Sequence, residues 1–143
     1  MFKVGINGLE DKIWRVIEVS DKMTVGYLAY SILASFNSLA YHLYSITYKD
    51  REYNCYIDDD LLFDDETALD ASQSILSNIW LNDNDIMEME YDFESMSTFK
   101  IKYLGYIKLE DIVKDTDKLG YSKYSYSPEY GTNKKMIWKY RII

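Results

Sequence analysis

The stretch that decides the fold is residues 24–48, TVGYLAYSILASFNSLAYHLYSITY. Thr24 stands where an N-cap residue would accept a hydrogen bond from the first turn of a helix. The helix is predicted to end near Asn37, and residues 42–48 follow as a strand. A helix with one apolar stripe needs an apolar surface to cover, so we expect the segments around it to form a sheet. The apolar side chains spaced for such a stripe are Val25, Leu28, Ala29, Ile32, Leu33 and Phe36.

Two pairs of strands flank this helix in the sequence. Residues 2–7 and 13–19 alternate apolar with polar side chains and are separated by a turn-like segment, which predicts a hairpin. Residues 42–48 and 53–57 predict a second hairpin, with a short turn between them. The helix is therefore expected to lie between two hairpins in chain order.

The third predicted hairpin has the clearest alternation. Residues 87–93 place Met87, Met89, Tyr91 and Phe93 between acidic residues, and residues 99–103 place apolar side chains between lysines. Such alternation is typical of strands with one face on the core and one in water. We expect acidic groups of one strand to face lysines of the next, so that part of the negative charge here has a structural role.

The remaining segments are less regular. Residues 68–80 show a moderate helical pattern, residues 109–114 predict a short helix, residues 118–133 read as loop, and residues 135–143 predict a final apolar strand. The predicted fold class is α+β, with a mixed β-sheet of hairpins packed on a central helix. A chain of 143 residues suits one domain over residues 1–143, with residues 107–143 as a C-terminal extension.

Charge is distributed unevenly along the chain. Residues 50–95 carry 15 acidic side chains and one basic side chain, Arg51, whereas the rest of the chain carries 9 acidic and 15 basic ones. An acidic middle of this kind repels a phosphate backbone and attracts a basic surface. One cysteine and one histidine give no zinc-site spacing, and the N-terminus does not resemble a secretory signal. These features indicate a cytoplasmic protein without a membrane span, a cofactor or a bound metal.

The residues that come closest to a catalytic pair are His42 and Cys55. A two-residue turn at Asp50 and Arg51 would place Cys55 opposite Ile46, which puts His42 about 13 Å away at the usual rise of a strand. That distance is too long for proton transfer from thiol to imidazole. We therefore expect no catalytic residue, with His42 and Cys55 serving the packing of the sheet.

Six acidic residues surround the apolar segment at 61–63. They lack the alternating ligands and the glycine of a calcium loop, so a solvated acidic loop is favoured over a metal site. Held on a folded scaffold, such carboxylates can also imitate the charge of a nucleic acid and contact a basic partner. The predicted partner-binding residues are Asp58, Asp59, Asp60, Asp64, Asp65 and Glu66.

The C-terminal segment has the opposite character. Its basic side chains are interleaved with tyrosines and Trp138, a combination that can contact phosphates and stack on bases. A plain loop and strand with solvated lysines explains the same composition. The residues predicted for the nucleic-acid alternative are Lys134, Lys135, Lys139 and Arg141.

Three short motifs, in order, resemble the plasmid pRiA4b ORF-3-like family. They are Ile13-Trp14-Arg15-Val16-Ile17-Glu18-Val19 followed by Thr24-Val25, then His42-Leu43-Tyr44-Ser45-Ile46, and then Tyr91-Asp92-Phe93. The resemblance covers residues 3–106 and implies an α+β fold with a mixed sheet packed on helices. It implies an origin on plasmids and other mobile elements, but no settled activity.

The chain departs from the family at several polar positions. Many relatives carry glycine and aspartate after the Asp-Phe pair, then tryptophan and histidine, and a histidine on the helix. This chain has Glu94 and Ser95, then Ser97 and Phe99, and Ala29 on the helix. If those polar groups form a site in the relatives, the resemblance implies that this chain has lost or altered it.

The charge pattern and the resemblance together lead to one functional hypothesis. The chain is expected to be a non-catalytic binding protein of a phage or other mobile element, acting as an acidic inhibitor of a host nucleic-acid-processing enzyme such as a CRISPR or restriction nuclease. Its partner would be a host or element-encoded protein with a basic surface. The alternatives are a nucleic-acid-binding accessory protein that uses the C-terminal segment, and an enzyme of unknown reaction. Acidity that serves only solubility is the simplest competing explanation.

Overall fold

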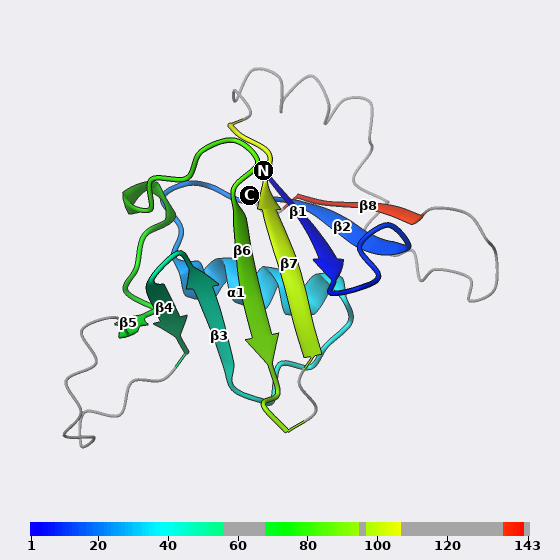
Figure 1. The fold of residues 1–143 in the computed structure, drawn as a ribbon, viewed down its shortest axis with the longest axis horizontal. Coiled ribbons are helices and arrows are strands. Elements are labelled where there is room, and N and C mark those ends of the chain that lie inside the picture. Colours follow the sequence, from blue (N-terminus) through cyan, green and yellow to red (C-terminus); the bar gives the residue numbers. More distant parts are fainter. Residues whose placement is uncertain (56–67, 95–96, 107–135, 142–143) are drawn as a thin grey trace.

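A computed structural model describes residues 1–55, 68–94, 97–106 and 136–141 of the chain. These residues form strands around one α-helix, with a short 3₁₀ helix near the middle of the chain (Figure 1). In chain order the elements are β1 (Phe2–Ile6), β2 (Ile13–Glu18), α1 (Val25–Ser35), β3 (Tyr44–Tyr48), β4 (Arg51–Asn54), β5 (Ala68–Asp70), η1 (Leu76–Asn78), β6 (Ile86–Tyr91), β7 (Ser97–Tyr103) and β8 (Met136–Arg141).

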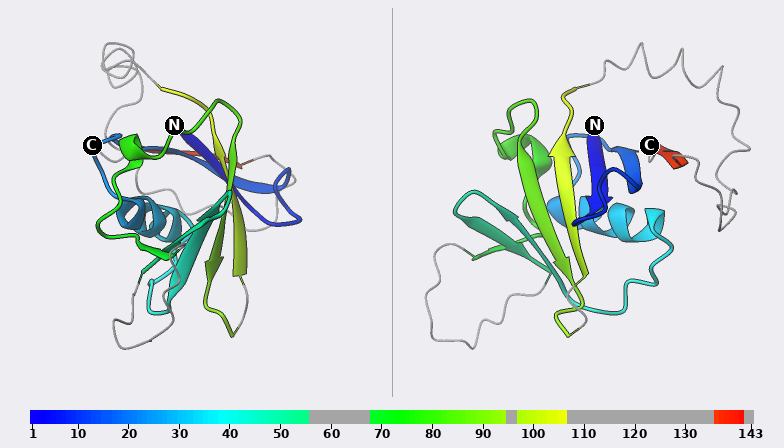
Figure 2. Two further views of the ribbon diagram at one scale, coloured as in Figure 1. Left: turned by 60° about the vertical axis from the view of Figure 1, so that its left-hand side comes forward. Right: turned by 45° about the vertical axis from the view of Figure 1, so that its right-hand side comes forward.

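The eight strands form one sheet in the order β5-β4-β3-β6-β7-β1-β2-β8. The β4–β5 and β2–β8 pairs are parallel and the other pairs are antiparallel, so the sheet is mixed. The α+β class is confirmed, and the three predicted hairpins occur as β1–β2, β3–β4 and β6–β7. They are parts of one sheet, however, and α1 lies across one face of that sheet instead of forming its centre (Figure 1, Figure 2).

Helix α1 begins where the sequence predicts. The Thr24 hydroxyl accepts a hydrogen bond from the Tyr27 backbone N–H at 3.1 Å, which satisfies a donor that the first helical turn leaves without a partner. The predicted apolar stripe faces the sheet. Its first five members are buried, and Phe36 is partly buried against the same core; the five are Val25, Leu28, Ala29, Ile32 and Leu33. The helix ends at Ser35, and Asn37 adopts a positive φ of 59° just beyond it.

A buried cation joins the first hairpin to the end of this helix. Arg15 on β2 is buried, and its Nε donates a hydrogen bond to the Ser35 carbonyl at 3.1 Å. Its guanidinium carbon lies 4.6 Å from the ring centroid of Phe36. Positive charge is favourable at the carbonyl end of a helix, so Arg15 fixes the helix against β2, even though burial lowers its pKa.

The helix predicted over residues 68–80 is wrong. The segment forms strand β5, a turn and the 3₁₀ helix η1. The Asp70 carboxylate accepts hydrogen bonds from the backbone N–H and the hydroxyl of Ser72, both at 2.7 Å, and such local bonds compete with a helix. The segment also caps the N-terminus of α1. The Ser74 carbonyl accepts a hydrogen bond from the Val25 N–H, and the Ala71 carbonyl accepts one from the Gly26 N–H, both at 2.8 Å.

The approach of this segment to α1 is close. A Cβ atom on Gly26 would lie 3.0 Å from the Tyr44 hydroxyl oxygen and 3.3 Å from the Ala71 carbonyl oxygen. Glycine at this position therefore lets the first turn of the helix contact β3 and the segment after β5. The sequence pattern of the helix alone does not reveal this packing.

The third hairpin is confirmed, with one correction at its end. Met87 and Met89 on β6 and Phe99 and Ile101 on β7 are buried as the alternation predicts. Strand β6 ends at Tyr91, however, and Phe93 is about half exposed in the turn, not part of the apolar face. The final strand is also confirmed, as β8, and it pairs with β2. The segments predicted as a short helix at 109–114 and a loop at 118–133 lie outside the described residues.

Candidate functional site

The sheet face opposite α1, called the open face below, is divided by charge. It is formed by the side chains that alternate with the core residues along each strand. On β4 and β6 these side chains include Glu52, Glu88 and Glu90, called the acidic half. On β1 and β7 they are Lys3, Lys100 and Lys102, called the basic half. The boundary runs between β6 and β7, where Glu88 lies opposite Lys100.

The carboxylates of the acidic half do not use the lysines across the boundary. Although Glu88 and Lys100 are cross-strand partners as predicted, the Lys100 ammonium lies 3.0 Å from a carboxylate oxygen of Glu10. Within the described residues, Glu88 and Glu90 are exposed and form no ion pair. Glu52 joins them through the register, because Thr47 lies between Glu52 and Glu88. Among the described residues, the acidic half therefore presents carboxylates without an ion pair on the strands of the sheet.

The basic half contains like charges in register. Lys3 and Lys102 lie directly opposite each other on β1 and β7, an arrangement that costs stability without a bound anion. The Lys3 ammonium lies 4.8 Å from the ring centroid of Trp14 on β2, which offsets part of that repulsion. The register continues from Lys3 to Val16 and from Val16 to Lys139 on β8. Lys139, predicted from the sequence as a nucleic-acid contact, is thus placed in the same row as Lys3 and Lys102.

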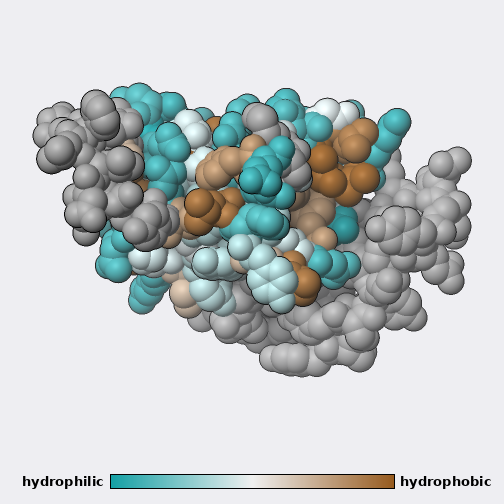
Figure 3. Space-filling view, turned by 90° about the horizontal axis from the view of Figure 1, so that it is seen from below, coloured by the Kyte–Doolittle hydropathy of each residue, from teal (hydrophilic) through white to brown (hydrophobic). Residues whose placement is uncertain are grey.

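Two of the family motifs meet at one end of the sheet, which faces down in Figure 1. The α1–β3 loop and the β6–β7 turn lie together there, because the Asp92 N–H donates to the Leu43 carbonyl at 3.0 Å. His42 Nδ1 lies 3.7 Å from Asp92 Oδ1, and its ring meets Tyr91 edge-on. Seen from below, apolar patches lie between hydrophilic residues (Figure 3). The exposed apolar residues from this loop and turn are Leu39, Tyr41, Leu43 and Phe93.

The predicted register of the second hairpin is wrong. The turn lies at Lys49 and Asp50, with Tyr48 paired to Arg51, and Lys49 has the positive φ of 55° that the turn requires. Cys55 therefore aligns with Tyr44, whose backbone N–H donates to the Cys55 sulfur at 3.3 Å. Cys55 thus lies two positions nearer to His42 along the strand than the sequence predicts. The His42 imidazole is directed at Asp92 and Tyr91.

A second polar contact ties the β3–β4 turn to the segment before β6. The Tyr48 hydroxyl donates a hydrogen bond to Asp85 Oδ2 at 2.5 Å, and the Asn82 N–H donates to the same oxygen at 2.9 Å. These two bonds hold the pKa of Asp85 below its ordinary value, while burial first and the Asp85 contact second raise the pKa of Tyr48. No local sequence pattern predicts this pair, because the two residues are 37 positions apart.

None of the six acidic contact residues predicted from the sequence belongs to the described part of the chain. Asp58, Asp59, Asp60, Asp64, Asp65 and Glu66 lie outside the described residues, as do Lys134 and Lys135. Lys139 and Arg141 belong to β8, where the register pairs them with Val16 and Glu18. In the described part of the chain, no three His, Cys, Asp or Glu residues gather as a metal site would require. No helix there has the length and apolar character needed to cross a membrane.

The motifs and the fold lead to one assignment. The family model of plasmid pRiA4b ORF-3-like proteins matches residues 1–128. This chain belongs to the plasmid pRiA4b ORF-3-like family. The match includes all three motifs of the sequence, and it extends beyond residues 3–106, which carry the resemblance. No curated protein matches the chain.

One solved structure has a similar fold. It is described as "Crystal Structure of Protein of Unknown Function MM3350 from Methanosarcina mazei Go1", and the two chains superpose with a TM-score of 0.62 at 22% sequence identity. The similarity covers 73% of this chain and 58% of the archaeal chain. At this identity the likeness shows the fold alone.

Two positions at which the resemblance implies histidine in many relatives belong to the core of this chain. Ala29 on α1 is fully buried, and Phe99 on β7 is buried against Phe36, with ring centroids 5.1 Å apart. At both positions this chain therefore has an apolar side chain packed between helix and sheet, where the resemblance implies a polar one.

The contact between Tyr48 and Asp85 makes a prediction about acid stability. Because the pKa of Asp85 is lowered by folding, its contribution to stability is complete above the unfolded value of about 3.9 and is lost as the pH falls through the lower folded value. Urea unfolding of Tyr48→Phe and of the wild type should differ most at pH 7 and converge below about pH 4. Tyr30→Phe, at an exposed ring, serves as the control. A difference that stays constant from pH 7 to pH 3 would contradict the assignment.

Proposed function

We propose that this protein is a non-catalytic binding protein of a mobile element, and that the acidic half of its open face contacts a basic surface on a partner protein. The observation that carries the proposal is that Glu88 and Glu90 are exposed on β6 without an ion pair among the described residues. The partner class that fits this charge is a nucleic-acid-processing enzyme, such as a host CRISPR or restriction nuclease, whose groove is basic because it holds phosphates.

The geometry supports binding more than it supports solubility alone. Charges that only keep a protein soluble are mixed in sign across the surface, whereas here the acids lie on one half of the sheet and the lysines on the other. The sheet also fixes the spacing of the carboxylates, so less side-chain and backbone ordering is needed when a partner binds. The six acidic residues between positions 58 and 66 follow β4 in the sequence and carry further negative charge.

The acidic half gives a direct mutational test. The triple variant Glu52→Gln, Glu88→Gln, Glu90→Gln keeps the shape of the side chains but removes three charges. Used as bait in host lysate at about 50 mM salt, the wild type should retain a basic, nucleic-acid-processing protein that about 300 mM salt releases, because screening weakens attraction between exposed charges. The triple variant should retain that protein at least tenfold less well at low salt.

The matched control changes the net charge equally at other exposed sites. Asp11→Asn, Asp21→Asn, Glu94→Gln should retain the partner as the wild type does, because none of the three residues belongs to β4 or β6, and Glu94 lies in the turn beyond the end of β6. Equal retention by the two triple variants would contradict a contact through the acidic half.

The basic half supports a second candidate function, the binding of nucleic acid. The specific observation is that Lys3 and Lys102 lie opposite each other, and that the register continues to Lys139. A row of cations beside an indole ring suits a phosphate backbone with a base stacked near it. In this function the C-terminal strand contributes to a surface of the sheet, not to a separate basic tail.

The salt dependence of DNA and RNA binding tests the second candidate. If the basic half contacts phosphates, the double variant Lys3→Gln, Lys102→Gln should lower the slope of log affinity against log salt by about 2, and adding Lys139→Gln should lower it by about 1 more. Lys12→Gln, Lys22→Gln, which removes two exposed charges elsewhere, should leave the slope unchanged. Absence of retention of the wild type on either polymer at about 20 mM salt would eliminate nucleic-acid binding.

A further inference from the structure

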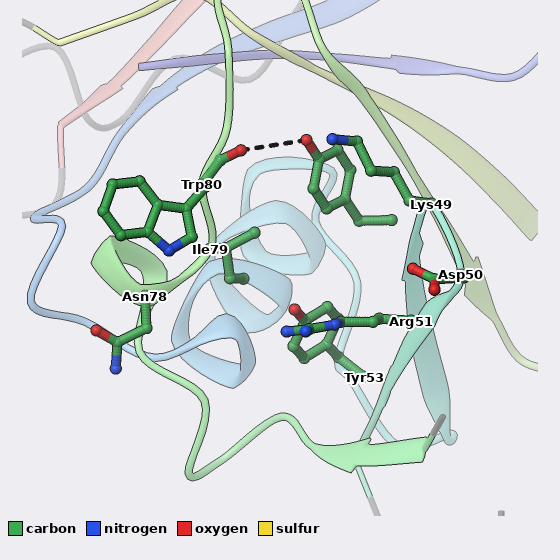
Figure 4. A pocket seen from close by; sticks show the side chains of 8 residues that line it. Lys49, Asp50, Arg51, Tyr53, Asn78, Ile79 and Trp80 are labelled. Atoms are coloured by element: carbon green, nitrogen blue, oxygen red, sulfur yellow. Dashed lines mark hydrogen bonds between the residues drawn. The ribbon is translucent and has the colours of Figure 1, made fainter. Parts of the chain in front are cut away.

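A small pocket lies at the sheet edge, between the β3–β4 turn and the segment around η1. Its volume is about 210 Å³. Lys49 in the β3–β4 turn and Arg51 and Tyr53 on β4 line one side, and Asn78, Ile79 and Trp80 line the other side (Figure 4). Arg51 and Tyr53 alternate with Glu52 along β4, so the pocket opens on the other side of the sheet from the acidic half.

The Tyr53 hydroxyl is a buried donor without a partner among the described residues. Tyr53 is only 2% exposed and belongs to the hydrophobic core, yet within the described residues its hydroxyl makes no hydrogen bond. A buried polar group without a partner destabilises the folded state, so such groups are rare and need an explanation. Because Tyr53 lines the pocket, an acceptor atom in that pocket would supply the missing partner.

Positive charge surrounds the same pocket. Arg51 is the one basic residue between positions 50 and 95, and it forms no ion pair with any described residue. The Lys49 ammonium is held 5.0 Å from the ring centroid of Tyr48. Asp50 also borders the pocket, but it lies between these two cations in the turn, which leaves a net positive charge. The charged groups of the pocket therefore favour an anion.

Ile79 supplies the apolar wall of the pocket. It is buried, and in Figure 4 it lies between Trp80 and the pair Arg51 and Tyr53. Trp80 is 87% exposed and borders the pocket, with its indole directed away from Arg51 and Tyr53. Pockets for drug-sized ligands measure about 300 to 1,000 Å³, so this one accommodates a smaller body, about one ring.

We propose that this pocket binds a small organic anion that carries one acid group on a single flat ring. The acid oxygens accept hydrogen bonds from the Tyr53 hydroxyl and the Arg51 guanidinium, and the ring packs on Ile79, beside Trp80. This site is independent of the acidic half and does not depend on the proposed partner. The donors recognise a carboxylate or a phosphate equally, so the test uses both acids.

Titration with sodium benzoate and with phenyl phosphate, followed by the tryptophan indole N–H resonances, tests the site in the full chain. Trp80→Phe assigns the Trp80 resonance. We expect at least one acid to shift that resonance with saturation at a Kd of about 1 mM, and benzamide, which lacks the charge, to bind at least tenfold more weakly. Which acid binds more tightly distinguishes a carboxylate from a phosphate ligand.

Two variants separate the roles of the donors. Arg51→Gln should weaken binding of the preferred acid about tenfold or more, and Lys22→Gln, an exposed lysine elsewhere, should leave it unchanged. Tyr53→Phe should weaken binding about three- to tenfold while raising the melting temperature of the unliganded protein, because it removes the hydroxyl without a partner. The proposal is overturned if neither acid saturates by about 20 mM, if benzamide binds as tightly as benzoate, or if Arg51→Gln binds as the wild type does.

Discussion

One helix of eleven residues covers an eight-stranded sheet in the part of the chain that the structure describes, and the other features follow from this constraint. The apolar stripe of α1 and the inner side chains of the strands form one core between them. Arg15 fixes the orientation of the helix, since its guanidinium binds the last turn from β2. The side chains on the opposite face of the strands then meet water, and their composition is free to serve binding.

On the open face, acidic and basic side chains lie on different strands instead of forming pairs across neighbouring strands. An antiparallel sheet can neutralise acids and lysines across neighbouring strands, and the boundary between β6 and β7 offers that arrangement at Glu88 and Lys100. Lys100 is drawn to Glu10 in the β1–β2 turn, and Lys102 faces Lys3. The result is a sheet with a negative side and a positive side. Long-range attraction to a charged partner is the direct physical consequence.

The sequence was sufficient for features that depend on local patterns. The cap at Thr24, the apolar stripe of α1 and the alternation in β6 and β7 each report on one element, and each is confirmed. Features that depend on tertiary contacts were predicted wrongly. Residues 68–80 have helical spacing, but two of their carbonyls accept hydrogen bonds from the first N–H groups of α1. The Asp70 carboxylate accepts a hydrogen bond from the Ser72 N–H, which favours a turn over a helix. The β3–β4 register was misjudged because a non-glycine residue, Lys49, takes the positive φ of the turn.

The candidate surfaces show the same division. The excess of acidic residues between positions 50 and 95 is visible in the sequence. That Glu88 is not paired with Lys100 is visible only in the structure, where Lys100 forms an ion pair with Glu10. The pocket could not be predicted at all. Arg51 and Tyr53 come from β4 and Trp80 follows η1, and only the packing of β4 against that segment brings them together.

The central claim is that the acidic half is exposed and unpaired in the complete protein, and carboxyl footprinting tests it most directly. Carbodiimide-driven coupling of glycine ethyl ester, read by peptide mass spectrometry, measures how accessible each carboxylate is. The account predicts rapid modification of Glu88 and Glu90 and slow modification of Glu10, which is paired with Lys100, and of Asp85, which is bonded to Tyr48. Glu88 and Glu90 modified as slowly as Glu10 would show that the rest of the chain covers or neutralises the open face, and would contradict the account.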